Sequence, residues 1–192
     1  NGANVVSMSY GSENSSNAMQ DLIYAYPEVV FIAAAGNDSS STQNYPAAYQ
    51  NVIGVGSVDS NDLRSSFSNY NVGFPWIDIA APGGYSYGGL LSTVYTESLN
   101  GYARFGGTSM ATPFAAGLVG LMLSVNPSLT PIQIQNCLVN SGVEINQSIG
   151  PRIDAYQALL CAQPENENPI PAFTASPQVT FENQSVTFSN NS

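Results

Sequence analysis

The sequence contains no histidine and no lysine, and its only cationic side chains are 3 arginines. Histidine is the usual general base that takes the proton of a serine or cysteine nucleophile, and lysine is a known substitute. These residues alone therefore lack a base for nucleophilic catalysis. The 13 acidic residues give a net charge of −10, which argues against nucleic acid and anionic membranes as partners, because both attract basic patches.

Cysteine and long apolar runs are also scarce. Cys137 and Cys161 are the only cysteines, too few for a disulfide framework and without metal-ligand spacing around them. They are compatible with one disulfide in an exported protein, or with two buried thiols in adjacent helices. The longest uninterrupted apolar run with small residues, 114–123, is shorter than the roughly 20 residues that cross a bilayer, so no membrane span is predicted.

The pattern that is present is that of an α/β domain. The 192 residues suffice for one good-sized domain, or for a domain and part of another. Apolar runs at 4–10, 29–35, 52–58 and 77–80 predict strands, and the middle two read as strands buried on both faces. Helical spacing of apolar residues predicts a helix over 15–26. Strand, helix and strand in this order indicate a βαβ unit and a parallel sheet.

The following segment is predicted to be mostly helical. We expect a hairpin over 88–105 that turns at Asn100-Gly101, and then a helix over 108–125. That helix is apolar nearly all round, which predicts burial in the middle of the domain, with Pro113 in its first turn. Further helices are expected from residue 131 and over 153–161.

A change of composition at Gln163 predicts a domain boundary. Residues 163–170 are polar and rich in proline, which is typical of a linker after a first domain at 1–162. Apolar residues then alternate with polar ones over 171–192, which indicates strands of a β-sandwich. This segment is too short to build a core, so the sandwich is expected to be incomplete.

The most informative motif is the string GTSMATP at 107–113. One interpretation is that Ser109 caps a helix. The other is that Ser109 is a nucleophile at a helix N-terminus, where backbone N–H groups favour developing negative charge. The full string, followed by an apolar helix of small residues, favours the second interpretation.

This string resembles the catalytic-serine motif of the subtilases, the subtilisin-like serine proteases. Further blocks resemble the same family in the same order: VSMSYG at 6–11, AAAGN at 33–37, YPAAY at 45–49, VIGVG at 52–56, SFS at 66–68, DIAAPG at 78–83 and RIDA at 152–155. The resemblance covers residues 1–162. It implies the α/β, parallel-sheet subtilisin-like fold and a secreted endopeptidase that cleaves peptide bonds through an acyl-enzyme, without a catalytic cofactor.

The resemblance also implies roles for single residues. Ser109 is the expected nucleophile, and Asn37 is expected to donate its side-chain amide to the oxyanion together with the Ser109 backbone N–H. The remaining residues are expected to bind substrate: Ser9, Tyr10 and Gly11 along an extended peptide, Ala34, Ala35 and Gly36 as walls of the specificity pocket, Asn44 as its floor, and Asp38 near its mouth.

The family's catalytic Asp and His have no counterpart in this sequence. Both are expected upstream of Asn1, which makes the chain the carboxy-terminal part of a catalytic domain, inactive alone. One alternative is a catalytically silent binding or adhesion module built on the same fold. Another is a sedolisin-type peptidase, which uses Glu in place of His, although Asn37 and Met110 favour the subtilisin branch.

Other implications concern partners and ions. The segment 171–192 resembles the start of a PKD domain, an immunoglobulin-like sandwich, which implies contact with a polymer or a cell surface. Residues near Ala47, Tyr49 and Val52 correspond to a weak cation site made of backbone carbonyls in some relatives, so structural calcium is expected. The protein is expected to be an extracellular monomer that acts on proteins or peptides.

Overall fold

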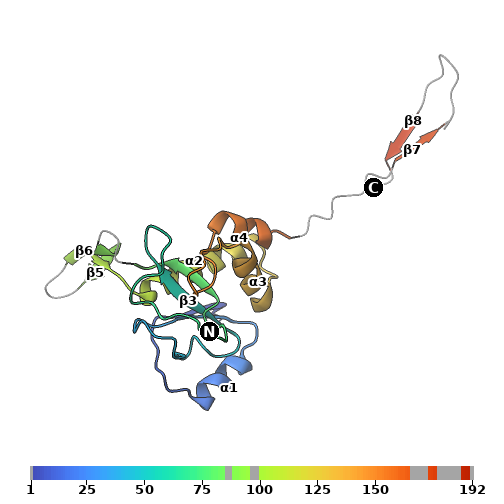
Figure 1. Ribbon diagram of the computed structural model, residues 1–192. Coiled ribbons are helices and arrows are strands. Elements are labelled where there is room, and N and C mark those ends of the chain that lie inside the picture. The colour runs from blue at the N-terminus through green and yellow to red at the C-terminus, as the bar shows by residue number, and fades with distance from the viewer. Residues whose placement is uncertain (1, 85–87, 96–99, 165–172, 177–186, 191–192) are drawn as a thin grey trace.

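The computed structural model describes residues 2–84, 88–95, 100–164, 173–176 and 187–190. Four helices and eight strands lie within these residues (Figure 1). In chain order they are β1 (Val5–Met8), α1 (Asn17–Ala25), β2 (Val30–Ala34), β3 (Val52–Val58), β4 (Ile79–Pro82), β5 (Leu90–Tyr95), β6 (Asn100–Phe105), α2 (Thr108–Val125), α3 (Pro131–Ser141), α4 (Ala155–Ala162), β7 (Phe173–Ser176) and β8 (Thr187–Asn190).

The centre of the fold is a parallel sheet with the strand order β1-β2-β3-β4. Its register pairs Val6 with Phe31 and Ile32 with Ile53, and pairs Val55 with Ile79. Every residue of β2 and β3 is buried, as expected for central strands covered on both faces. The predicted parallel sheet is therefore confirmed: β3 has its expected bounds, and the bounds of β1, β2 and β4 differ from the prediction by one or two residues.

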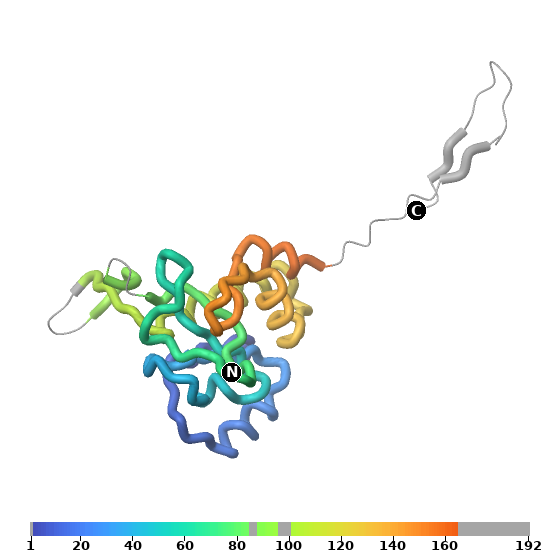
Figure 2. The backbone as a smooth tube through the Cα atoms, in the orientation of Figure 1, coloured from blue at the N-terminus to red at the C-terminus, as the bar shows by residue number. Residues whose placement is uncertain are grey.

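Two apolar layers cover the sheet, one on each face. On one face, Ile32 and Val55 pack with residues of α2, α3 and α4. On the other, Phe31 and Ala33 pack with Ile23 of α1 and with buried loop residues. In Figure 2 the blue α1 segment lies at the bottom of the view and the gold to orange segments of α3 and α4 lie at the upper right, with green segments of the chain between them. The alternation of side chains along each strand thus divides the core into two.

The helix α2 differs from its prediction in two respects. It is buried on the sheet side only, and its other side exposes large apolar residues, with Phe114 50% and Leu121 53% exposed. The expectation of burial all round is wrong for the described part of the chain, because the sheet covers one face alone. Pro113 is inside the helix, beyond the first turn, so its missing N–H leaves a carbonyl without its usual helical partner.

By length and composition α2 is the one helix in the described ranges that meets the criteria for crossing a membrane. Its sheet-facing residues Ala115, Val119 and Met122 are completely buried in the first apolar layer. This packing is that of a core helix in a sheet-containing domain, and it accounts for the apolar composition.

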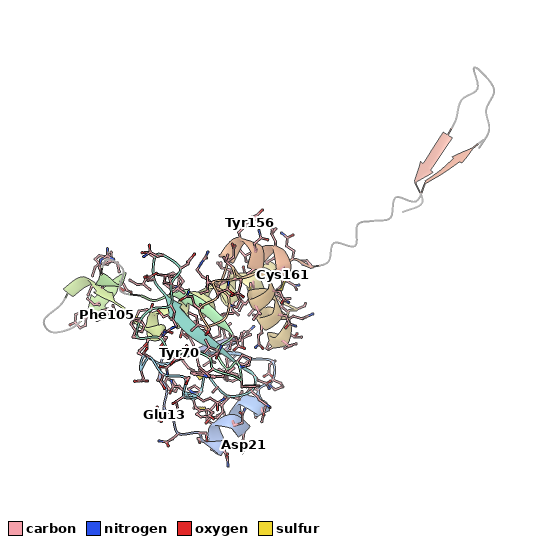
Figure 3. The ribbon with its side chains drawn as sticks, in the orientation of Figure 1. Glu13, Asp21, Tyr70, Phe105, Tyr156 and Cys161 are labelled. Carbon is pink, nitrogen blue, oxygen red and sulfur yellow. A yellow bond between two sulfur atoms is a disulfide. The ribbon has the colours of Figure 1, made fainter. Side chains whose placement is uncertain are left out.

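Side-chain caps and a disulfide fix the two helices that follow. Thr130 and Gln133 form a capping box at the start of α3, and Asp154 accepts a hydrogen bond from the Gln157 N–H at the start of α4. Cys137 of α3 and Cys161 of α4 form a disulfide, which decides between the two states left open by the sequence (Figure 3). The covalent link holds α4 against α3.

The hairpin β5-β6 corrects one sequence prediction. Asn100 pairs with Tyr95 and Gly101 with Val94, so both residues lie in the ladder rather than in the turn. The connection falls on residues 96–99, outside the described residues. Asn-Gly favours a two-residue turn, but here the strand pairing places the reversal before it.

In the tail, β7 and β8 pair antiparallel, with Phe173 opposite Asn190. Strand formation there agrees with the alternating pattern. The linker residues 165–170 and the segment 177–186 lie outside the described residues.

Candidate active site

Ser109 lies at the amino-terminal end of α2, one residue after Thr108 begins the helix. The first N–H groups of a helix have no intrahelical acceptor and carry the positive end of its dipole. The N-cap residue, Gly107, has no side chain that could accept hydrogen bonds from these N–H groups. The sequence therefore places a hydroxyl where developing negative charge is favoured.

Two reciprocal hydrogen bonds join Ser109 to the segment after β1. The Ser109 Oγ donates to the Ser9 carbonyl at 3.3 Å, and the Ser9 Oγ donates to the Ser109 carbonyl at 2.9 Å. In a regular helix the Ser109 carbonyl would accept the N–H of residue 113, but Pro113 has none. Because Pro113 lies beyond the first turn, the Ser109 carbonyl is available to accept the hydrogen bond that holds Ser9 beside Ser109.

Asn37 reaches the same place from the carboxyl end of β2. Its Oδ1 accepts hydrogen bonds from the Thr108 N–H and from the Thr108 Oγ, both at 2.9 Å. Because both Thr108 donors bind Oδ1, the Nδ2 group of the same amide points away from Thr108. Thr108 Oγ also accepts the Gly36 N–H at 3.2 Å, so one hydroxyl fixes the turn that carries Asn37.

The two expected oxyanion donors border one space. A methyl carbon placed on Gly107 would lie 3.5 Å from Asn37 Nδ2 and 3.7 Å from the Ser109 nitrogen. Glycine leaves this space open in front of Ser109. An oxyanion hole requires two preorganised donors beside the nucleophile, and these two nitrogens are the candidates for that role.

The expected substrate-binding residues lie at or just after the carboxyl ends of β1 and β2. Ser9, Tyr10 and Gly11 are exposed after β1, and Ala34 and Ala35 are buried at the end of β2. Carboxyl ends of adjacent parallel strands meet at one edge of a sheet, which is the usual position of ligand sites in α/β folds.

Asn44 lies between the two walls of the expected pocket and is only 8% exposed. A side-chain carbon on Gly11 would overlap the Asn44 amide, and one on Gly36 would lie 3.0 Å from its Nδ2. The structure therefore brings Asn44 together with Gly11 and Gly36. Asp38, the residue after Asn37, is exposed.

Sequence reasoning gave no role to Thr108 or Asn69, although both contact the segment that carries Asn37. Asn69 accepts the Asp38 N–H at 3.0 Å and donates to the Ala35 carbonyl at 2.9 Å. Thr108 was within the motif and was a reasonable candidate, since its hydroxyl is adjacent to the nucleophile. Nothing in the sequence signals the Asn69 contacts, because they span about thirty residues.

No base contacts Ser109 in the described part of the chain, where its hydroxyl donates to a backbone carbonyl. The described residues also contain no cluster of His, Cys, Asp or Glu suited to a metal ion. A carbonyl oxygen is too weak a base to activate a serine. The geometry thus supplies a nucleophile and oxyanion donors, while the proton acceptor has to come from elsewhere.

Asp78, just before β4, is the carboxylate whose pKa differs most clearly from its ordinary value. Burial raises the pKa of Asp78 from 3.8 to about 6, although hydrogen bonds from the Gly54 N–H at 2.7 Å and the Gln135 amide at 3.0 Å oppose the shift. It lies in a cavity of about 160 Å³ that is also lined by Ala47, Tyr49 and Val52.

This shift predicts a pH dependence of stability in calcium-free buffer. The folded state binds the Asp78 proton more tightly than the unfolded chain, so its contribution is fully present below pH 3.8 and is lost as the pH rises through about 6. Asp78→Asn removes this titration. We expect the variant to gain stability relative to the wild type between pH 4 and pH 7, by up to about 3 kcal/mol. Urea unfolding across this range measures the difference, and parallel curves would contradict the prediction.

Comparison with known proteins places the whole chain in context. The subtilase family model matches residues 1–169. Thermitase from Thermoactinomyces vulgaris is 40% identical over 163 residues, covering 82% of this chain and 54% of thermitase. Alkaline elastase YaB from a Bacillus strain is 39% identical over 150 residues, covering 77% of this chain and 37% of the elastase.

Solved structures agree with the fold. A protease from Pseudoalteromonas arctica superposes with a TM-score of 0.76 at 31% identity, covering 84% of this chain and 52% of that protein. The prenylagaramide maturation protease PagA superposes with a TM-score of 0.74 at 26% identity, covering 85% of this chain and 63% of PagA. The chain thus spans about half the length of the curated relatives it matches.

Proposed function

The chain belongs to the subtilase family of serine endopeptidases, and from this premise we propose that the intact protein hydrolyses peptide bonds with Ser109 as its nucleophile. By intact protein we mean these residues together with the segment that supplies the general base. The observation that carries the proposal is the shared space beside Ser109, bordered by Asn37 Nδ2 and the Ser109 N–H. Chemistry in this family needs no catalytic cofactor.

In the proposed reaction, the Ser109 Oγ attacks the scissile carbonyl carbon and loses its proton to the base. Asn37 Nδ2 and the Ser109 N–H stabilise the oxyanion of the tetrahedral intermediate. The intermediate collapses to an acyl-enzyme on Ser109 and releases an amine that receives the proton. Water then hydrolyses the ester by the reverse use of the same groups.

The base is proposed to come from a segment outside these 192 residues, together with the acidic residue that orients it. Support comes from the exposed side of α2, the helix that carries Ser109 as its second residue. An apolar hollow of about 470 Å³ there is lined by Phe114, Leu121 and Ile153, among others. Exposed apolar surface of this kind is typical of an interface, and the segment that supplies the base is proposed to cover it.

A serine-reactive phosphonate tests the proposal on the intact protein. We expect labelling at Ser109, mapped by peptide mass spectrometry, and no labelling of Ser109→Ala. The 192-residue chain alone should stay unlabelled, because an unactivated serine does not react. A folded, intact protein that resists labelling would favour the silent binding module. Such a module has no need for donors beside Ser109. The sedolisin alternative predicts a Glu base, and sequencing the transcript upstream of residue 1 distinguishes it.

The pocket between Gly11 and Gly36 is proposed to accept the side chain before the scissile bond, with Ser9, Tyr10 and Gly11 pairing with the extended substrate backbone. Ala34, Ala35 and Gly36 form its other wall. Because the Asn44 side chain fills the space between the walls, small substrate residues should be preferred.

Asn44→Gly is expected to open the pocket. Cleavage after phenylalanine relative to alanine, measured as the ratio of kcat/KM on matched peptides, should rise by at least about tenfold, since a few methylene groups are worth 1–3 kcal/mol each. Thr42→Gly is the matched control, because it introduces the same residue into the same loop at an exposed position. Equal ratios in both variants would remove Asn44 from the pocket.

A structural calcium ion is proposed for the cavity beside β3. Ala47, Tyr49, Val52 and Asp78 line it, and the proposed ligands are the backbone carbonyls of the first three and the Asp78 carboxylate. Oxygen donors with one negative charge fit a hard cation, which would act only on stability. A calcium-dependent rise of the melting temperature that a chelator reverses would support this site.

The remaining features of the proposal concern context. The peptidase part is proposed to occupy 1–162, followed by a linker at 163–170 and the start of a PKD-like sandwich at 171–192 that contacts a polymer or cell surface. The antiparallel pair β7-β8 and the alternating sequence support strands in that segment. The disulfide between Cys137 and Cys161 supports an extracellular location, since such bonds persist under oxidising conditions. The protein is proposed to be a monomer acting on proteins or peptides.

A further inference from the structure

Asn69 is a buried polar side chain to which no catalytic or binding role has been given above. It is 2% exposed and follows the turn at Ser65–Ser68, next to Tyr70, which is labelled in Figure 3. Burying an amide side chain costs free energy unless its hydrogen bonds are made within the protein. The partners of this amide therefore show what it holds.

All of these partners lie in the segment that carries Asn37. The Asn69 Nδ2 donates to the Ala35 carbonyl at 2.9 Å, and the Asn69 backbone N–H donates to the Gly36 carbonyl at 3.1 Å. On the other side of Asn37, the Asn69 Oδ1 accepts the Asp38 N–H at 3.0 Å and the Ser40 N–H at 3.1 Å. One residue thus binds the chain immediately before and immediately after Asn37.

Apolar packing does not hold this segment, because Asn37, Asp38 and Ser39 are exposed. Two further backbone hydrogen bonds tie its end to the same stretch of chain as Asn69: the Ser39 N–H donates to the Phe67 carbonyl at 2.8 Å, and the Ser40 carbonyl accepts the Tyr70 N–H at 3.0 Å. Asn69 itself is anchored through Ser68, whose Oγ donates to the Asn69 carbonyl at 3.1 Å and accepts the Ser57 N–H of β3 at 3.1 Å. A rigid strand is therefore linked through Ser68 and Asn69 to an exposed turn.

We propose that Asn69 is a positioning residue that holds the Asn37 turn so that Asn37 Nδ2 faces the oxyanion space. This inference rests on the proposed peptidase function. Thr108 fixes the side chain of Asn37, while Asn69 fixes the backbone on both sides of it. Displacement of a catalytic group by about 1 Å costs roughly a hundredfold in rate, so loss of Asn69 should act on kcat rather than on substrate binding.

The test uses a double-mutant cycle in the intact protein. Asn69→Ala should lower kcat by about 10-fold to 100-fold with KM little changed. In an Asn37→Ala background the same substitution should lower kcat by less than about twofold, because its target is already absent. Equal losses in both backgrounds, or a loss confined to KM, would overturn the proposal.

Asn71→Ala is the matched control. Asn71 also donates once and accepts twice, to the Ile77 carbonyl and from the N–H groups of Trp76 and Ile77, but it binds a different loop. It should destabilise the fold without lowering kcat. If Asn69→Ala does not fold, Asn69→Asp keeps the acceptor for Asp38 and Ser40, and its kcat should fall less than that of Asn37→Ala.

A second readout needs no activity. Hydrogen exchange at the Asp38 and Ser40 amides should accelerate at least about tenfold in Asn69→Ala relative to Asn71→Ala, because those amides lose their acceptor. Asn69→Asp keeps an oxygen acceptor, so exchange there should stay slow. Unchanged exchange overturns the positioning role. If the intact wild type shows neither turnover nor phosphonate labelling, the peptidase proposal fails, and the exchange experiment still decides whether Asn69 holds the turn.

Discussion

Ser109→Ala in the intact protein is expected to lower kcat by about 10⁶-fold, the scale of loss when the nucleophile of a serine protease is removed. The physical reason is that the other hydroxyl at the start of α2, that of Thr108, is buried and donates to Asn37 Oδ1, so it does not replace the Ser109 nucleophile. The α2 residues facing the sheet do not change, and alanine is a strong helix former, so folding should be preserved.

Ser124→Ala provides the control for this result. It makes the same substitution near the other end of the same helix, where the Ser124 Oγ donates to the Leu121 carbonyl on an exposed turn. Its kcat should equal that of the wild type on a chromogenic peptide. Residual turnover in Ser109→Ala is expected from the oxyanion donors alone. A loss of less than about tenfold in Ser109→Ala would exclude the acyl-enzyme route.

Local sequence signals were sufficient for the sheet and for the nucleophile. The apolar runs that became β2 and β3 are continuous, and a strand buried on both faces needs such a run whatever its neighbours. Ser109 lies within one short string at a helix start, so its place in the fold depended on nearby residues alone. The roles proposed for Ser109 and Asn37 came instead from the resemblance to the subtilases.

Features that depend on distant contacts were not predictable. The apolar composition of α2 indicated burial all round, but composition does not say which residues supply the cover, and one side is exposed here. Pro113 was expected in the first turn, and its actual place leaves the Ser109 carbonyl to Ser9, a contact across 100 positions. The predicted position of the hairpin turn was wrong because Asn100 and Gly101 are paired in the strand ladder, despite their local preference for turns.

The contacts of Asn69 are a further case of the same kind. An asparagine after a serine-rich turn is ordinary in sequence, since such residues favour turns for local reasons. Only the folded chain brings it to both sides of Asn37. Positioning of catalytic groups is therefore less visible in sequence than the groups themselves, because it depends on backbone atoms that every residue possesses.

Asn37→Ala should lower kcat by 10²-fold to 10³-fold, about 2.7–4 kcal/mol of transition-state stabilisation, and should change KM little. The amide donates to charge that develops only in the transition state, so its removal is not felt by bound substrate. Steady-state kinetics on an uncharged peptide, with Asp38→Ala as control on the same exposed turn, measure the effect. Asn37→Asp should be at least as harmful, because it replaces the donor with an acceptor. Asn37→Ala also frees the Thr108 N–H and Oγ donors, whereas Asn37→Asp keeps an oxygen that accepts them. A loss dominated by KM would show that Asn37 binds substrate instead.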